Sequence, residues 1–398
     1  QIACLTKNEF KIHYVDKSEF LNGYSIAKKI KRRKQNSELG EFSSFMEKEI
    51  FGQANSIRDS LRGRLGKDFE TVVLGGVDLE KKINRVLFVG CGTAYYAGLL
   101  GKYYIENIAG LPASVEYASE YKYKSNPTEE GTLVVAISQS GETLDTLGAI
   151  QEAKQKGLDT MAITNSVGSS MAREVPEGIY QRIGPEIAVA STKAFTSQMT
   201  LLLMLAISLG SRGALSKTKE QKYINEIRKI PELIERVLLL SKKIKRLAGL
   251  YQLCHSFDFL GRQYMYPIAM EGALKLKELT YMNCSGYPSG EIKHGPLATV
   301  GNSSNCFFIA PQKGLRNKNI SSIKEIKSRN GRVILITQEG IDFPEDCYDE
   351  IIRVPSAPDY ILPILSVIPL QMFAMYMASN KGHSIDKPRN LAKSVTVE

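Results

Sequence analysis

Two patterns of apolar and polar residues alternate in the first half of the chain. Short runs of consecutive apolar residues, such as RVLFVG at 85–90 and TLVVAI at 132–137, stand between longer stretches with helical spacing. Continuous apolar runs are typical of strands that are buried on both faces of a parallel sheet covered by helices. The pattern predicts strands at 85–90, 113–118, 132–137 and 159–165, and a helix at 93–110 that ends at a glycine.

The same order of elements returns in the second half, with strands predicted at 257–261, 305–314 and 331–338 and a helix at 266–282. Four pairs of matching positions are 171 to 173 residues apart: Gly90 and Gly261, Glu120 and Glu291, Val134 and Phe307, and Ala162 and Ile334. A nearly constant offset indicates a tandem repeat of one doubly wound α/β module, in which helices flank a parallel sheet. We predict the first module at 46–220 and the second at 221–384.

The two ends of the chain have other patterns. Residues 1–15 alternate around a polar TKNE turn, as a β-hairpin does, and residues 16–45 are polar and basic, as in a linker. Residues 45–65 have helical spacing, and 385–398 form an irregular tail. Because the chain begins with Gln1 and no signal pattern follows, we expect it to be a piece of a longer protein.

Composition narrows the class of protein. With 43% hydrophobic and 24% charged residues the chain is globular, and its longest apolar run, TLLLMLAISLG at 200–210, suits a buried helix and not a membrane span. The net charge of +10 suits a phosphorylated ligand, while the only dense basic run, KKIKRRK at 28–34, is typical of a linker more than of a nucleic-acid site. Six cysteines without CxxC spacing and four scattered histidines indicate reduced thiols in a cytoplasmic protein without zinc.

A loop rich in hydroxyl groups, SQSGET at 138–143, follows the apolar strand 132–137 and precedes a helix. At the carboxyl end of a parallel strand, a helix N-terminus favours an anion, and Ser138, Ser140 and Thr143 add donors suited to phosphate oxygens. Capping of the helix needs only one hydroxyl, so we favour a phosphate site over a cap. The matching loop of the second module, PQKGLR, lacks these hydroxyls, which assigns the chemistry to the first module.

Nucleotide sites fit the sequence less well. VGCGTAYYAG at 89–98 begins like GxGxxG, but Tyr95 stands where the third glycine is needed, and no GxxxxGK[ST] occurs. A small phosphorylated ligand is therefore the better prediction. A further hydroxyl-rich segment, VASTKAFTSQ at 189–198, also precedes a helix, and capping and ligand binding remain equally open for it.

Three other groups of residues carry chemistry whose role the residues alone leave open. Glu271, Lys275 and Glu278 lie on one face of a helix, either as surface ion pairs or as charges held near a core with perturbed pKa values. His294 lies in a glycine-flanked loop, where it is either incidental or a proton shuttle. Lys393, among apolar neighbours in the tail, is either a solvated charge or an amine able to form a Schiff base.

Taken together, six segments resemble the isomerase half of the glutamine–fructose-6-phosphate aminotransferase family, over about residues 40–398. They are CGTAYYAG, SQSGETLDTL, EIAVASTKAF, EGALKLKE, GEIKHGPLA and the terminal PRNLAKSVTVE. The resemblance implies the sugar-isomerase (SIS) fold, present twice. It also implies that fructose 6-phosphate and ammonia give glucosamine 6-phosphate without a cofactor or metal, and that glucose 6-phosphate and fructose 6-phosphate interconvert.

The resemblance also implies roles for individual residues. In these roles Glu278 moves a proton between C1 and C2, Lys275 assists that transfer, Lys393 attacks the open-chain ketose, and His294 opens the sugar ring from the neighbouring subunit of a homodimer. The residues that would bind the sugar and its phosphate are Thr93, Ser138, Gln139, Ser140, Thr143, Val189, Ser191 and Ala392.

Several positions depart from the family pattern. Ala94 replaces a serine, GRQ at 261–263 replaces Gly-Arg-Gly, and Ala172, Val175 and Tyr180 replace the hydroxyls or histidine near the UDP-sugar feedback site of eukaryotic members. Cys4 lies inside the hairpin and does not match the N-terminal cysteine of a glutaminase domain, so we expect no glutamine hydrolysis by this chain alone.

Two other functions remain as alternatives. A non-catalytic sugar-phosphate sensor would keep SQSGET but has no need of Glu278, His294 and Lys393 together. A free-standing sugar-phosphate isomerase would not explain the opening hairpin. We expect a cytoplasmic protein that binds neither nucleic acid nor membranes.

Overall fold

The computed structural model describes residues 2–5, 10–13, 20–22, 38–66, 71–75, 77, 81–125 and 129–396. The chain divides into two compact units, 1–38 and 39–398. In the first unit, β1 (Ile2–Leu5), β2 (Phe10–His13) and β3 (Phe20–Asn22) form an antiparallel sheet in that order. The first two strands pair as the hairpin pattern predicts. Most of the predicted linker lies outside the described residues, but β3 falls within it and is a strand.

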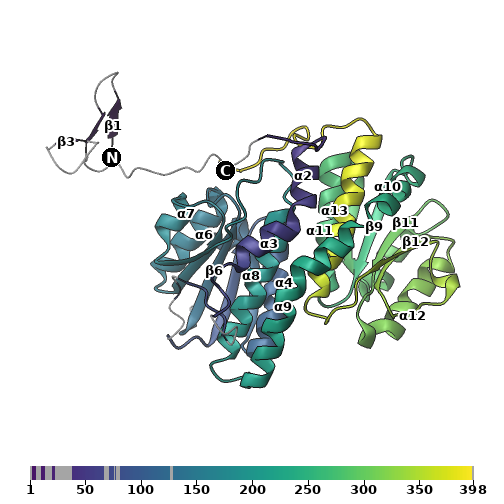
Figure 1. Ribbon diagram of the computed structural model, residues 1–398, viewed down its shortest axis with the longest axis horizontal. Coiled ribbons are helices and arrows are strands. Elements are labelled where there is room, and N and C mark those ends of the chain that lie inside the picture. The colour runs from purple at the N-terminus through teal and green to yellow at the C-terminus, as the bar shows by residue number, and fades with distance from the viewer. Residues whose placement is uncertain are drawn as a thin grey trace. The chain divides into compact units, whose positions relative to one another are not determined.

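The second unit contains two parallel five-stranded sheets (Figure 1). The strands of the first sheet lie in the order β5-β4-β6-β7-β8 and those of the second in the order β10-β9-β11-β12-β13. Both orders are the 2-1-3-4-5 order of a doubly wound fold, so the predicted fold class of two tandem modules is confirmed. The strands are β4 (Arg85–Gly90), β5 (Ala113–Tyr117), β6 (Thr132–Ser138), β7 (Asp159–Thr164), β8 (Glu177–Tyr180), β9 (Ser256–Gly261), β10 (Asn283–Pro288), β11 (Asn305–Ile309), β12 (Arg332–Gln338) and β13 (Glu350–Val354).

Helices follow most of these strands. Before and within the first module lie α2 (Phe45–Phe51), α3 (Gln53–Leu61), α4 (Thr93–Tyr104), the π-helix η1 (Ile105–Ala109), α5 (Ala118–Tyr121), α6 (Leu144–Gln155), α7 (Ser170–Glu174) and α8 (Lys193–Gly210). The later helices are α9 (Lys217–Leu238), α10 (Ser241–Leu250), α11 (Met265–Thr280), α12 (Arg316–Lys327) and α13 (Leu362–Asn380). Short 3₁₀ turns lie at η2 (Glu291–His294), η3 (Pro296–Thr299), η4 (Lys313–Leu315) and η5 (Glu345–Cys347).

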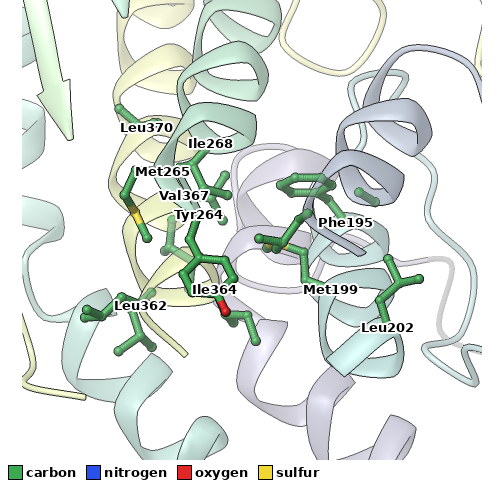
Figure 2. Close-up of a cluster of buried hydrophobic side chains, with 14 of the residues drawn as sticks. Phe195, Met199, Leu202, Tyr264, Met265, Ile268, Leu362, Ile364, Val367 and Leu370 are labelled. Carbon is green, nitrogen blue, oxygen red and sulfur yellow. The ribbon is translucent and has the colours of Figure 1, made fainter. Parts of the chain in front are cut away.

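One hydrophobic core joins the two modules. Helices α4 and α8 of the first module pack against α11 and α13 of the second. Figure 2 shows side chains from this junction, among them Phe195 and Met199 of α8, Ile268 of α11 and Leu370 of α13. Helices α8 and α13 are long and apolar enough to cross a membrane, but 89% and 94% of their most apolar windows are buried inside the protein. Their apolar character therefore serves this core, as predicted for 200–210.

Two predicted elements of the second module end earlier than expected. The helix predicted to reach residue 282 ends at Thr280, because Tyr281 adopts a left-handed conformation with φ of 60° that ends the helix. The strand predicted to reach residue 314 ends at Ile309 and gives way to the turn η4 after Pro311. Both corrections shorten an element without changing its place in the module.

Candidate active site

A cavity of about 120 Å³ opens at the carboxyl ends of β4 and β6. After β4 the chain crosses to β5 at one edge of the sheet, and after β6 it crosses to β7 toward the other edge. Doubly wound folds bind ligands at such a point, where the strand order changes direction. The cavity is lined by Cys91, Thr93, Ala94, Ile137, Ser138, Gln139, Ser140, Thr143, Thr146, Val189, Ser191, Gln198 and Lys393. Eight of the twelve residues that we assigned to the site from the sequence are in this set.

The loop 138–143 is held in shape by its own side chains and by a glycine. Ser138 Oγ accepts a hydrogen bond from Gly141 N at 3.0 Å and lies 3.2 Å from Thr143 Oγ1. Gly141 has φ of +66°, and a Cβ there would lie 2.1 Å from Ser169 Oγ, so only glycine fits. Thr143 is the N-cap residue of α6, yet its hydroxyl makes no capping bond. Thr143 lines the cavity, so capping alone does not account for the loop.

The C-terminal tail closes one side of the cavity. Val395 O accepts a hydrogen bond from Leu144 N at 3.2 Å, at the start of α6. Ser394 Oγ donates to Ser140 Oγ at 3.1 Å, and Lys393 Nζ donates to Glu186 Oε2 at 2.6 Å. The tail therefore brings an ammonium group to the cavity from the far end of the sequence.

Glu186 is a fully buried carboxylate beside this ammonium. Its Oε1 accepts from Thr192 N at 2.9 Å and Ala194 N at 3.0 Å, while Oε2 accepts from Ser191 Oγ at 2.9 Å as well as from Lys393. Burial by itself raises the pKa of Glu186, but the charge of Lys393 and these hydrogen bonds outweigh burial and hold it below the usual value. Glu186 is therefore ionised at neutral pH.

A second group of charges lies on α11, next to the cavity. Lys275 Nζ is 2.7 Å from Glu278 Oε2 and 3.5 Å from Glu271 Oε1, and it donates to Thr93 Oγ1 at 3.1 Å. Thr93 in turn donates to Glu271 Oε1 at 3.1 Å. Thr93 lines the cavity, so it links the α11 charges to that space.

The three α11 charges differ in burial. Lys275 and Glu271 are fully buried, whereas the Glu278 side chain is 21% exposed. Burial raises the pKa of Glu271 to about 8, against the lowering effect of Lys275 and with help from the negative charge of Glu278. Burial lowers the pKa of Lys275, but the two carboxylates more than reverse this and raise it above its usual value. Lys275 therefore remains an ammonium group that lies between two carboxyl groups.

Glu49 of α2 is another buried carboxyl near Glu186. Burial, followed by the negative charge of Glu186, raises the pKa of Glu49 to about 7. Its Oε1 accepts from the backbone N–H of Ile187, while Oε2 is buried without a hydrogen-bond partner. Between pH 4.5 and 7 the unfolded chain thus releases a proton that the folded chain keeps.

We expect Glu49→Gln to change how stability depends on pH. The raised pKa favours the folded wild type most below pH 4.5, and this contribution is lost as the pH rises through 7. The melting temperature of Glu49→Gln minus that of the wild type should therefore increase from pH 4.5 to 7 and then level off. Thermal unfolding at half-unit pH steps measures this difference, and a constant difference over the range would contradict it.

Four residues assigned from the sequence do not line the cavity. Lys275 and Glu278 lie next to it as described, and Ala392 is an exposed neighbour of Lys393. His294 ends the turn η2 and is exposed. Within the described part of one chain, nothing brings His294 to the cavity.

The departures from the family pattern have structural counterparts. Ala94 lines the cavity, so the family's serine would stand at the cavity wall. Gln263 has φ of +54°, a conformation that suits glycine, and its side chain accepts a hydrogen bond from Gln312 Nε2 at 3.0 Å. Ala172 lies on α7, and Val175 and Tyr180 lie at and beyond its end.

Sequence reasoning did not assign Cys91, Thr146, Gln198 and Glu186, although EIAVASTKAF begins with Glu186. An acidic residue shortly before a hydroxyl-rich helix start was the signal available in the sequence. Burial raises the pKa of the Cys91 thiol, which disfavours its reactive thiolate. Among the described residues, His, Cys, Asp and Glu form no group of three that would hold a metal ion.

Known proteins resemble this chain closely. A sequence model of the SIS domain family matches residues 80–208 and 250–381. A glutamine–fructose-6-phosphate aminotransferase (isomerizing) of Bacteroides thetaiotaomicron is 43% identical over 93% of this chain and 61% of its own length. One from Caldanaerobacter subterraneus is 42% identical over 99% of this chain and 66% of its own length.

A solved structure gives the same result. The C-terminal domain of glucosamine-fructose-6-phosphate aminotransferase from Francisella tularensis is 34% identical, with a TM-score of 0.84, and the match covers 89% of this chain and all of that one. The chain thus spans less than two thirds of the two curated relatives but the whole of this domain. The chain belongs to the SIS domain family, in the group that includes the C-terminal domain of glucosamine-fructose-6-phosphate aminotransferase.

Proposed function

We propose that this chain binds fructose 6-phosphate and interconverts ketose and aldose sugar phosphates. The observation that carries the proposal is the position of a hydroxyl-lined cavity beside the Glu271–Lys275–Glu278 cluster, with Thr93 belonging to both. Phosphate binding needs hydroxyl and N–H donors at a helix start, and isomerisation needs a carboxylate that takes and returns a proton.

In this proposal each group has one task. Ser138, Ser140 and Thr143 hold the phosphate at the start of α6. Glu278 takes the proton from one of C1 and C2 and returns it to the other. Lys275 compensates the negative charge that develops during this transfer, and Lys393 offers an amine to the open-chain ketose.

Amination is a further part of the proposal. The names of the relatives state transfer of an amino group from glutamine to fructose 6-phosphate. Because this chain spans about three fifths to two thirds of their length, we propose that a glutaminase domain outside it supplies ammonia and that glucosamine 6-phosphate is the product. We further propose a cytoplasmic enzyme with a module boundary near residue 220.

The direct test is the interconversion of glucose 6-phosphate and fructose 6-phosphate by the purified chain, followed by a coupled enzyme assay. We expect turnover without an added metal or nucleotide. Binding of fructose 6-phosphate without turnover would contradict the proposal and favour a sugar-phosphate sensor. The sensor is not favoured, since it has no use for the charged cluster on α11.

We also propose that the chain forms a homodimer in which His294 completes the cavity of its neighbour. The exposure of His294 and its absence from the lining of the cavity in its own chain support this arrangement. The ring-opening role would then require a second copy.

Mixing two inactive variants tests this arrangement. In a hybrid of Glu278→Gln and His294→Ala chains, one of the two sites has both an intact Glu278 and an intact partner histidine. Random mixing should thus restore about one quarter of the wild-type isomerase activity, since half of the dimers are hybrids with one working site. Each variant refolded alone is the control. Hybrids that stay inactive would show that His294 acts within its own chain, and a His294→Ala variant that is active alone would show that His294 has no role in turnover.

A further inference from the structure

Glu186 lies between two parts of the cavity wall that are far apart in the sequence. It follows β8 in the chain, and its side chain touches Ser191, just before α8, and Lys393 of the tail. Lys393 is 207 residues away from it. Both contacted residues line the cavity, but Glu186 itself does not.

The two carboxylate oxygens have separate partners. Oε1 accepts from Thr192 N and Ala194 N, and so holds the start of α8. Oε2 accepts from Ser191 Oγ and Lys393 Nζ, and so holds the two cavity residues. A carboxylate fixed on one side by backbone N–H groups cannot rotate freely, so the direction of Oε2 determines where Lys393 is held.

Four other ionisable groups, each on a different element, interact electrostatically with Glu186. Glu49 lies on α2, Lys193 on α8, Lys275 on α11 and Lys393 on the tail. Lys193 Nζ donates to Ile183 O at 3.0 Å. In the described structure, Lys393 is the charged group that bonds directly to Glu186.

We propose that Glu186 is a positioning residue that fixes Lys393 and Ser191 at the cavity and thereby docks the C-terminal tail on the phosphate-binding loop. Lys393 is followed by Ser394 and Val395, whose bonds to Ser140 and Leu144 join the tail to that loop. Once Lys393 is held, these two contacts lie one and two residues further along the chain. This inference rests on the proposed function for its kinetic consequence, but the docking of the tail does not depend on turnover.

The test replaces Glu186 by glutamine in the full chain. The glutamine side chain retains an Oε1 that accepts from the α8 backbone but loses the charged oxygen that binds Lys393 and Ser191. Two readouts follow from the proposal. Trypsin should release residues 394–398 about tenfold faster, since a charged hydrogen bond no longer shields Lys393. The kcat of isomerisation should fall at least about tenfold, with the KM for fructose 6-phosphate changed less than about threefold.

The matched control is Glu220→Gln. Glu220 is also a buried glutamate near the start of a long helix, α9, and it pairs with Lys217 at 3.1 Å, away from the cavity. Its substitution should leave both readouts unchanged.

If Glu186→Gln does not fold, Lys393→Met removes the same ion pair from the tail side. Amide exchange of Leu144, whose N–H bonds to Val395 O, should then be faster than in the wild type.

The outcomes separate this inference from the proposed function. Unchanged release of 394–398 together with unchanged kcat in Glu186→Gln would overturn the positioning role, even if the wild type isomerises sugar phosphates. A wild type that does not isomerise, but whose tail is released faster in Glu186→Gln, would overturn the proposed function and keep the positioning role. In the double variant Glu186→Gln/Lys393→Met, the exchange rate of Leu144 should equal that of Lys393→Met alone, because both act through one contact.

Discussion

Glu278→Gln is expected to reduce the kcat for interconversion of glucose 6-phosphate and fructose 6-phosphate by about 10²- to 10⁴-fold, the usual contribution of a general base. Glutamine has nearly the same shape, so it can still lie beside Lys275, 2.7 Å away in the wild type, but it cannot take a proton from carbon. The side chain is 21% exposed, and Glu271 Oε1, 3.5 Å from Lys275 Nζ, remains as a second carboxyl partner of the buried lysine.

Two measurements identify the cause of this loss. The affinity for fructose 6-phosphate, measured by calorimetry, should stay within about threefold of the wild type because the loop 138–143, which we propose binds the phosphate, is unchanged. In heavy water, the wild type should exchange a carbon-bound hydrogen of the substrate for deuterium, and the variant should not. Glu152→Gln on α6, which is not part of the cavity lining, serves as the control. Retention of more than about a tenth of the turnover by Glu278→Gln would assign the proton transfer to another group.

Lys275→Met is expected to destabilise the folded chain by about 3–5 kcal/mol, the range seen when one partner of a buried ion pair is removed. Lys275 is 1% exposed and Glu271 is fully buried, so once the pH reaches about 8 and Glu271 ionises, the variant leaves a buried carboxylate without a compensating charge. Glu271 would respond by holding its proton more tightly. The loss should therefore be larger at pH 8 than at pH 6.

Denaturant unfolding of three matched variants checks this expectation. Lys277→Met lies two positions away on the same helix but is exposed, so it should change the stability by no more than about 0.5 kcal/mol. The double variant Lys275→Met/Glu271→Gln should recover much of the loss, because the buried carboxyl is gone. A loss in Lys275→Met that the double variant does not recover would point to packing of the lysine stem in place of charge compensation.

The central strands of both modules could be predicted from the sequence, whereas three edge strands could not. Strands β4, β6, β11 and β12 are almost completely buried, so each shows as a continuous apolar run. Strands β8, β10 and β13 lie at sheet edges and are only partly buried. Because an edge strand needs apolar residues on fewer sides, sequences such as EGIY and NCSGYP show no clear pattern.

The candidate site divides in the same way. The loop 138–143 is continuous in sequence and follows a buried strand, so its hydroxyls could be assigned to a ligand site from the sequence alone. The link from Thr93 to Lys275, and the contact from Glu186 to Lys393, join residues that are 182 and 207 positions apart. No spacing rule reaches across such distances without a resemblance to known proteins.

By itself, the sequence determined the repeated α/β module, the confinement of the hydroxyl loop to the first copy and the buried character of its long apolar helices. These properties depend on local spacing, since burial on one or two faces leaves a period in the chain. Only the tertiary structure decided which charges meet. The raised pKa of Glu271, the ion pair of Lys393 with Glu186 and the position of the tail each depend on groups that are distant in the sequence. These groups meet only when the folded chain buries them together, away from water.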